Sequence, residues 1–332
     1  MNAWKIERVI HFGPNDLCKD GFVHFGFHDR AGRQYALEHR KHFIGLVGGN
    51  DTLKWTVAAD KVFADVPNIY ADIKYPMYID GLPDGTLVVS NFGNARLYRI
   101  DVRRMEARLF VDGSKLGMRD IGNCVVDNEG CVWVNEVEGC RMWRFNYEGR
   151  TLLTLGDGTP GFQSDNTDFS EVRFNWIYDI RRGPEGNIYV LDSRNFAVRM
   201  IDLGLHRVRT IAGMGKAGYE GDGGDARFAT FGSEPAARFD GPISLSLDEE
   251  GDIYVGDRYN HVVRMVHRKT GVITTIAGNY DATDGERNSP KESNPLRLNL
   301  PQISSMDYWN GYLFIPTDIT EDSGDLIVLR KA

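Results

Sequence analysis

Two segments of the chain repeat each other without a gap, and this repeat limits the possible folds more than any other feature of the sequence. Residues 173–213 and residues 238–278 match at a constant offset of 65 positions. The matched pairs include Gly186/Gly251, Asp192/Asp257, Asn195/Asn260, Arg199/Arg264 and Gly213/Gly278. Such a period is typical of architectures in which each repeat is one small unit that stacks on its neighbours.

Each copy reads as an antiparallel meander. In the second copy, four short apolar runs predict four strands at Ile243–Leu247, Ile253–Val255, Val262–Val266 and Val272–Ile276. Turn residues such as Glu249-Glu250-Gly251 separate the runs. One small meander cannot bury both of its faces, so it must pack against its copies. Sheets of this kind, stacked radially, form a β-propeller.

Weaker copies of the repeat cover the rest of the chain. They lie at residues 21–47, 73–113, 118–156 and 298–329. The last copy has only three strands, whereas Trp4–Ile10 reads as a lone strand without a meander. A strand that completes the last blade would remove an exposed sheet edge. The sequence therefore predicts an all-β fold, a six-bladed β-propeller of four-stranded antiparallel blades in one domain over residues 1–332, with the last blade closed by the N-terminal strand.

Composition narrows the possible partners. The 332-residue chain is 42% hydrophobic and has a net charge of −8, which argues against nucleic-acid binding. We find no signal peptide and no apolar run of about 20 residues, so we expect no membrane partner and a cytoplasmic location. Four cysteines without CxxC spacing indicate reduced thiols. The oligomeric state is left open.

One stretch carries a family resemblance. The segment Pro242 to Arg264, which contains the pattern G-x-I-Y-V-x-D-x-x-N-x-x-V-R from Gly251 onward, resembles the NHL repeat. The glycine-rich loop Ala212–Ala226 is similar to a segment common between blades of bacterial NHL proteins. NHL propellers are related to the gluconolactonase and senescence-marker family, strictosidine synthases and antibiotic lyases. The resemblance implies the fold but not the function, because such propellers include enzymes and binding modules.

Three connections between blades are unusually long. They span residues 155–172, 212–237 and 277–297 and are rich in Gly, Asp and Asn. Long loops of this kind in a compact domain are often functional. From the order of strands in a meander, we expect all three to rise around the channel on the face where the innermost strands begin.

Polar residues at the starts of the innermost strands suggest a cation site. Three carboxylates and two amides would converge there, and oxygen ligands suit Ca²⁺ or Mg²⁺. The predicted metal ligands are Asp20, Asp120, Asn175 and Asp240. Asp20-Gly21-Phe22-Val23 resembles the Glu-Gly-Pro stretch that opens the first blade of gluconolactonase-type enzymes, which hold a divalent metal. The alternative is that Asn175 and Asp240 only cap turns.

Basic and aromatic residues at the same positions suggest a site for an anionic substrate. The first copy contains half of the histidines and the basic turn Glu38-His39-Arg40-Lys41-His42. Imidazole groups can transfer protons near neutral pH. The candidate catalytic residues are His24, His39 and Arg119, and the candidate substrate-binding residues are Arg40, Lys74, Tyr75 and Trp176. Alternatively, the basic turn is an exposed hairpin tip, His24 packs between blades, and the aromatics form the packed wedge between blades.

A second set of polar residues ends the second strand of each copy and reads as structural. Its members are Glu38, Asn91, Glu136, Asp192 and Asp257, with Asn94, Asn195 and Asn260 three positions later. We expect these carboxylates to fix turns through backbone N–H groups. Arg199 and Arg264 should lie between blades or at the surface, without a chemical role.

These observations predict an enzyme that acts on a small, anionic, carbohydrate-derived substrate. The reaction would be metal-assisted hydrolysis, as in a lactonase, or lyase elimination at the channel mouth. The alternative is a non-catalytic ligand- or protein-binding propeller that uses long-loop residues such as Tyr219, Phe228 and Phe231.

Overall fold

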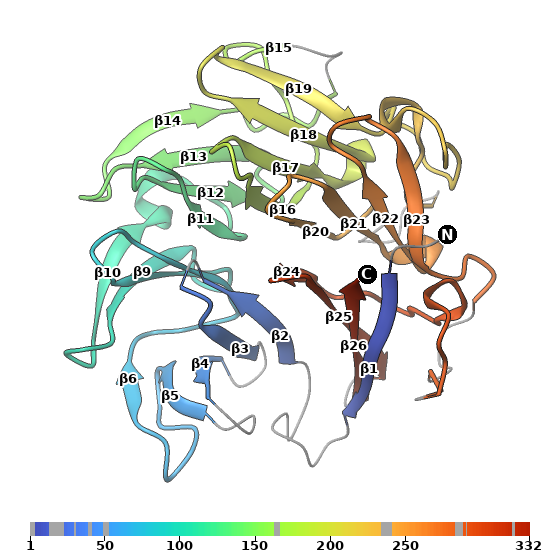
Figure 1. Cartoon of the computed structure of the whole chain (residues 1–332). Helices are drawn as coiled ribbons and strands as arrows, with labels where there is room; N and C mark the ends of the chain where they lie inside the picture. Colours follow the sequence, from blue (N-terminus) through green and yellow to red (C-terminus); the bar gives the residue numbers. More distant parts are fainter. Residues whose placement is uncertain are drawn as a thin grey trace.

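The fold is a ring of six small antiparallel sheets, as the repeat predicted (Figure 1). The computed structural model describes residues 4–12, 23–29, 31–38, 42–48, 53–162, 167–233, 241–282, 288–289, 291–320 and 323–332. Apart from the outer-edge strands Trp4–Phe12 and Thr167–Asp168, the strands of each blade follow one another in the chain from the innermost to the outermost (Figure 1). The chain is therefore a six-bladed β-propeller.

The first three blades are built as follows. Blade 1 contains β2 (Val23–His28), β3 (Gln34–Glu38), β4 (Phe43–Val47), β5 (Leu53–Ala58) and the short parallel β6 (Asn68–Tyr70). Blade 2 contains β7 (Pro76–Gly81), β8 (Leu87–Asn91), β9 (Arg96–Asp101) and β10 (Glu106–Asp112). Blade 3 contains β11 (Cys124–Val126), β12 (Val132–Glu136), β13 (Arg141–Phe145) and β14 (Thr151–Leu155).

The other three blades follow the same plan. Blade 4 contains β16 (Ile177–Arg182), β17 (Ile188–Asp192), β18 (Ala197–Asp202) and β19 (Arg207–Ala212), with the two-residue β15 (Thr167–Asp168) on its outer edge. Blade 5 contains β20 (Ser244–Leu247), β21 (Ile253–Asp257), β22 (Val262–Val266) and β23 (Ile273–Gly278). Blade 6 contains β24 (Asp307–Trp309), β25 (Tyr312–Thr320), β26 (Ser323–Lys331) and β1 (Trp4–Phe12).

Blade 6 is closed by the N-terminal strand, which confirms the predicted ring closure. β1 pairs antiparallel with β26 from Trp4↔Lys331 to Phe12↔Gly324. Trp4 is 3% exposed and packs edge-on against Tyr254 of blade 5, with 5.5 Å between ring centroids. The closing strand is thus held by backbone pairing and by a buried aromatic side chain.

Alternation along each strand explains why no blade is stable alone. In β17, Ile188 and Val190 are buried in the cluster shared with blades 1–3. Tyr189 and Leu191 point the other way, into the cluster formed with blade 5. A period of two places neighbouring residues on opposite faces of the sheet, so both faces need a partner.

In alternate blades the hairpin between the first and second strands is fixed by an Asp and a Gly. In blade 5, Asp248 Oδ1 accepts hydrogen bonds from the backbone N–H of Glu250 (3.0 Å) and Asp252 (2.8 Å). Gly251 has φ +84, a left-handed conformation that residues with a Cβ disfavour. These hydrogen bonds and the glycine fix the turn, and the turn fixes how the first and second strands pair.

The long loops do not all rise around the channel, which corrects the expectation from strand order. Part of the loop between blades 4 and 5 runs along the outer edge strand β23, where Gly223 N–H donates to Ile273 O and Ala226 N–H donates to Gly271 O. Similarly, β15 pairs with β19 on the outer edge of blade 4. These segments occupy backbone groups that an edge strand would otherwise expose.

The glycine-rich loop is anchored by a buried arginine. Arg264 on β22 is 0% exposed, and its guanidinium donates to Thr230 O (2.7 Å), Glu220 O (3.0 Å) and Asp222 Oδ1 (2.7 Å). Asp222 Oδ2 in turn accepts from the Thr275 N–H of β23. Arg264 therefore holds the loop against its blade.

No described helix is long and apolar enough to span a lipid bilayer.

Candidate functional site

The starts of the innermost strands are fixed by the acidic residues that end the second strands. Asp192 accepts from the Asn175 N–H (2.7 Å) and from Asn195 Nδ2 (2.8 Å). Glu136 makes the corresponding bond to the Arg119 N–H in blade 3 (2.8 Å). These bonds confirm the predicted turn-fixing role and set the backbone at the channel mouth.

The corresponding residue of blade 5 fixes a loop rather than a strand start. Asp257 is fully buried and accepts from the Gly232 N–H (3.0 Å) and from Asn260 Nδ2 (2.7 Å). Burial raises the pKa of Asp257 to about 6, although its hydrogen bonds and Arg264 act in the opposite direction. Blade 2 departs from the pattern: Asn91 is buried, and its side-chain amide has no hydrogen-bond partner among the described residues.

Trp176 stands at the start of the inner strand of blade 4 and forms the centre of the candidate site. Its φ of +61 is unusual for a bulky residue, and strained backbone of this kind is concentrated at functional sites. The Arg194 guanidinium lies over the indole ring, 4.1 Å from its centroid. The Trp176 N–H donates to Cys140 Sγ of blade 3 at 3.4 Å.

Arg119 and Asp120 lie beside this group, at the start of blade 3. The charges of Asp120 and Arg119 both act on the pKa of Cys140, which places them near the Trp176 contact. Arg119 is exposed, and its guanidinium forms no ion pair within the described part of the chain. Burial raises the pKa of Asp120 to about 6, and its two carboxylate oxygens accept from the backbone N–H groups of Val137 and Glu138.

Lys74 and Tyr75 occupy the same position in blade 2. Tyr75 is 47% exposed and has φ +50, so it repeats the conformation of Trp176. Its N–H donates to His42 Nδ1 of blade 1 at 3.2 Å, and the two rings meet edge to face at 4.8 Å. The bond to Nδ1 places the proton of a neutral His42 on Nε2. The Lys74 side chain is 56% exposed, and its Nζ lies 4.0 Å from Asp72.

A further arginine continues this arrangement in blade 5. Arg258 directly follows the strand-ending Asp257, and its Nη2 donates to Gln302 Oε1 at 2.6 Å. Gln302 precedes the inner strand of blade 6 and shares the left-handed backbone of Tyr75 and Trp176, with φ +45. We call Lys74, Arg119, Arg194 and Arg258 the basic arc. Four cations at one end of neighbouring blades favour an anionic ligand.

The predicted cation site is only partly described. Asp120 is 5% exposed and directs both oxygens at backbone donors, as in a turn cap. Among the described residues, no group of three or more His, Cys, Asp or Glu side chains could hold a metal ion. Asp120 and Asn175 alone therefore do not fit a Ca²⁺ or Mg²⁺ site. Asp20 and Asp240 lie outside the described residues.

Other predicted site residues also fall outside the description. His39 and Arg40 are not among the described residues, and His24 lies in β2 with a side chain that is not described. His28, from the same histidine-rich copy, is structural: its Nδ1 lies 2.6 Å from Asp307 Oδ2 of blade 6. His42, which that copy also contains, lies at the channel mouth beside Tyr75.

A buried charge cluster on the propeller axis was not predicted. Arg181 of β16 forms an ion pair with Asp179, lies over the Tyr78 ring of blade 2 and donates to Met306 O of blade 6. Arg181 belongs to blade 4, which does not adjoin blade 2 or blade 6. A side chain of blade 4 can contact both of those blades only near the propeller axis, so Arg181 crosses the channel. Its positive charge disfavours a second cation at this level.

Carboxylates of this cluster also join the blades. Asp80, Asp179 and Asp307 come from alternate blades, and each accepts from a backbone N–H of the next inner strand: Val126 (2.7 Å), Leu245 (2.8 Å) and His28 (3.0 Å). Burial raises the pKa of Asp179 to about 6 and also raises the pKa of Asp307. The cluster is therefore a structural element that lies on the axis.

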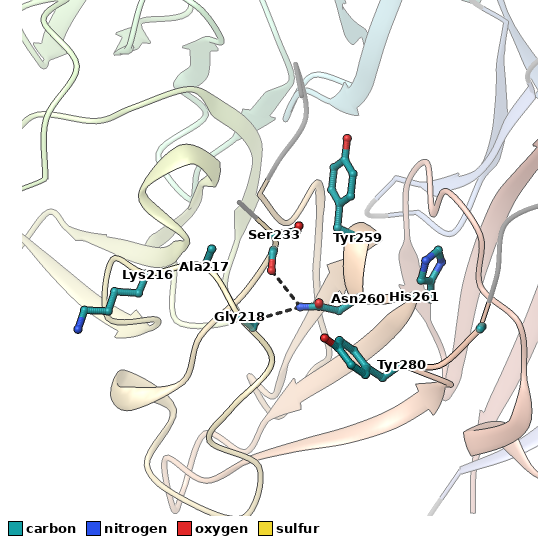
Figure 2. A pocket seen from close by; sticks show the side chains of 10 residues that line it. Lys216, Ala217, Gly218, Ser233, Tyr259, Asn260, His261 and Tyr280 are labelled. Carbon is teal, nitrogen blue, oxygen red and sulfur yellow. Dashed lines mark hydrogen bonds between the residues drawn. The ribbon is translucent and has the colours of Figure 1, made fainter. Parts of the chain in front are cut away.

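A separate cavity of about 650 Å³ opens beside blade 5 (Figure 2). We call it the tyrosine pocket; its lining includes Gly218, Gly232, Ser233, Tyr259, Asn260 and Tyr280. The three loop aromatics that were expected to form a binding face lie in different environments. Phe231 is fully buried, Phe228 is 67% exposed, and Tyr219 stacks on Tyr280.

Comparison with known proteins supports the fold. No family model matches the chain. A segment of 150 residues is 31% identical to SUPPRESSOR OF QUENCHING 1, chloroplastic, of Arabidopsis thaliana, and covers 43% of this chain but 13% of that protein. The chain thus corresponds to a small part of that relative.

Several solved structures share the whole ring. A virginiamycin B lyase from Staphylococcus aureus has a TM-score of 0.55 and 12% identity, covering 96% of this chain and 82% of its own. An auxiliary nutrient binding protein from Bacteroides thetaiotaomicron has a TM-score of 0.61 and 14% identity, covering 94% and 69%. A luciferin-regenerating enzyme has a TM-score of 0.58 and 10% identity, covering 97% and 95%. At these identities the likeness concerns the fold.

Proposed function

We propose that the chain is an NHL-type propeller enzyme, related to the gluconolactonase and senescence-marker family, that acts on a small, anionic, carbohydrate-derived substrate at the channel mouth. The observation that carries this proposal is the basic arc, which concentrates positive charge in a chain whose net charge is −8. Enzymes among the proteins of similar fold, a lyase and a luciferin-regenerating enzyme, are consistent with catalysis on this scaffold.

The residues at the mouth have distinct roles in this proposal. Arg119 and Arg194 bind the substrate's carboxylate, because guanidinium groups form paired hydrogen bonds with carboxylates. Trp176 holds Arg194 by ring stacking at 4.1 Å and orients it. Lys74 and Tyr75 bind the other end of the substrate, together with the predicted Arg40.

Two reactions suit such a substrate. In hydrolysis of a sugar lactone, water adds to the carbonyl carbon and the ring C–O bond breaks. In elimination, a proton leaves the carbon beside the carboxylate and the C–O bond to the leaving group breaks. Both need a group that takes up and returns a proton. His42 Nε2 is the candidate among the described side chains, and His24 and His39 remain proposed candidates.

The predicted divalent cation is a separate proposal, with Asp20, Asp120, Asn175 and Asp240 as its ligands. When bound, such an ion would polarise a carbonyl or carboxylate oxygen. Asp120 and Asn175, the described members of this set, do not make the site alone. Elemental analysis of the purified protein tests the proposal: a near-stoichiometric divalent ion that is lost in Asp20→Ala and Asp240→Ala supports it, and metal-free active protein contradicts it.

The function is tested with two substrate panels. Sugar-acid lactones are followed by acid release, and uronic-acid oligosaccharides by the ultraviolet absorbance of the unsaturated product. We expect turnover in one panel and a KM about tenfold higher or more in Arg194→Ala, since a hydrogen bond to a charged group contributes about 1.5–3 kcal/mol. Arg103→Ala, in an exposed turn between the two outer strands of blade 2, is the matched control and should leave KM unchanged.

Two results would contradict the proposal. The first is no turnover of any substrate together with no binding of sugar acids. The second is equal KM values for Arg194→Ala and Arg103→Ala. Binding of sugar acids without turnover would instead support the alternative, a non-catalytic ligand-binding propeller, which the nutrient-binding protein of similar fold also represents.

A further inference from the structure

We propose that the tyrosine pocket is a second ligand site, which binds a neutral sugar ring. The pocket lies between the loop that precedes blade 5, the turn of Arg258–Asn260 and the segment that follows β23. Its volume of about 650 Å³ accommodates one or two sugar units. This inference does not depend on the reaction proposed above, because none of the basic-arc residues lines the cavity.

The aromatic side of the pocket is rigid before any ligand binds. Tyr280 stacks face to face on Tyr219, with 4.6 Å between ring centroids and 5° between ring planes. The Tyr219 hydroxyl is 2.8 Å from Thr275 Oγ1, and Arg264 lies 5.4 Å from the Tyr219 ring centroid. Tyr280 is therefore the outer layer of a supported stack, and it remains 52% exposed. A fixed, accessible ring offers the apolar contact that one face of a sugar requires.

The polar side of the pocket is built around Asn260, which is 4% exposed. Its Nδ2 donates to Gly218 O at 2.9 Å and to Gly232 O at 3.4 Å (Figure 2). This orients the side chain and leaves Oδ1 as an acceptor without a partner among the described residues. Figure 2 shows the Tyr280 ring beside Asn260, with Ser233 also near it, whereas the Tyr259 ring projects away from Asn260. The hydroxyls of Tyr280 and Ser233 add donors and acceptors.

Charge argues for a neutral ligand. No carboxylate lines the described part of the pocket, and Lys216, at its rim, directs its ammonium group away from Asn260 (Figure 2). Pockets for drug-like apolar ligands are mostly hydrophobic, whereas this lining combines hydroxyl, amide and main-chain groups and the imidazole of His261 with tyrosine rings. A polyhydroxylated ring with one apolar face matches that combination, and a sugar unit is such a ring.

The test is calorimetric titration of the full chain with four neutral disaccharides: cellobiose, maltose, lactose and chitobiose. We expect saturable binding of at least one of them. Tyr280→Ala should weaken this binding about tenfold or more, whereas Tyr280→Phe should retain most of it because the ring face is kept. Tyr70→Ala is the matched control, since Tyr70 is another exposed tyrosine (64%) but lies on the outer edge of blade 1.

A second variant tests the cavity itself. Ser233→Trp places a large side chain in the pocket and should abolish binding, with unchanged thermal unfolding as the check that the protein is folded. The proposal is overturned if no disaccharide binds the wild type, or if binding survives both Tyr280→Ala and Ser233→Trp. It is also overturned if Arg194→Ala abolishes binding while Tyr280→Ala does not, because the ligand would then occupy the channel mouth. Failure of the enzymatic proposal leaves these outcomes unchanged.

Discussion

Arg264 and Asp222 form an ion pair, with 2.7 Å between Nη2 and Oδ1, that joins the glycine-rich loop to the third strand of blade 5. The two residues are 42 positions apart, and the arginine is completely buried. The arginine that ends the NHL-like pattern therefore has a structural explanation. It satisfies loop carbonyl groups that would otherwise lack partners.

Arg264→Ala should lower the free energy of unfolding by about 3 kcal/mol, because it leaves two carbonyls and a carboxylate without their donor. Asp222 is 40% exposed and can be rehydrated, so we expect the lower end of the range for buried pairs. Chemical denaturation measures the loss. Arg227→Ala, an exposed arginine paired with Asp225 in the same loop, should change stability by about 0.5 kcal/mol or less. Equal effects of the two variants would refute the anchoring role.

Trp4→Ala should destabilise the protein by about 3–5 kcal/mol, as expected for truncation of a buried tryptophan. The loss should be accompanied by faster hydrogen exchange along β1 and β26, because the side chain secures the closing strand. Lys5→Ala is the control, since Lys5 is an exposed residue of the same strand. A change below about 1 kcal/mol for Trp4→Ala would show that the ring stays closed without this anchor.

Arg181→Met should destabilise the protein by about 3–5 kcal/mol at neutral pH, since it removes the cation from a buried group of carboxylates. The pKa of Asp179 is already about 6 in the native protein and should rise further without Arg181. A native pKa above the unfolded value favours the folded state as pH falls, so the variant should recover part of its stability between pH 7 and pH 5. Arg182→Met, an adjacent arginine that bonds Asn128 at 3.2 Å, should show neither effect. A pH-independent loss would contradict this explanation.

Asp257→Asn tests the buried acid that holds Gly232 and Asn260. Burial raises the pKa of the wild-type carboxyl from its ordinary value of 3.8 to about 6, so the stability that it contributes falls as pH rises through this window. The substituted amide does not titrate. Its N–H₂ group must face either the Nδ2 donor of Asn260 or the N–H of Gly232, so one of these two hydrogen bonds is lost, which costs about 1–3 kcal/mol. We therefore expect a large loss of stability near pH 4 and a smaller one at pH 7. Unfolding curves across that range check the sign, and a cost that grows with pH would contradict it.

The fold could be predicted because its determinants are local and repeated. A left-handed glycine such as Gly251 recurs in the hairpin between the first and second strands of every blade, and an aspartate such as Asp248 precedes it in alternate blades. The lone strand at Trp4–Ile10 and the incomplete last copy predicted the closure that β1 and β26 make. The loop paths were predicted incorrectly, because hydrogen bonds such as that from Gly223 to Ile273 do not follow the repeat.

The site was predicted in outline only. Asp192 and Glu136 could be assigned to turns because their spacing from the following strand is constant. Arg181 and Tyr78 come from blades that are not neighbours, and nothing in their sequence positions indicates that they meet. Likewise, Tyr219 and Tyr280 lie in different loops and stack only after blade 5 has folded between them.

The pairing of β1 with β26 also constrains how the protein is made. During synthesis β1 emerges before the other strands of the ring and β26 emerges after them, so β1 has no partner strand until translation has passed Lys331. The nascent chain must keep β1 unpaired, or protected by a chaperone, throughout that interval. Joining the two strands through a short linker and opening the chain at a hairpin between blades should remove this delay, since a circular permutant would form the sixth sheet from one continuous segment.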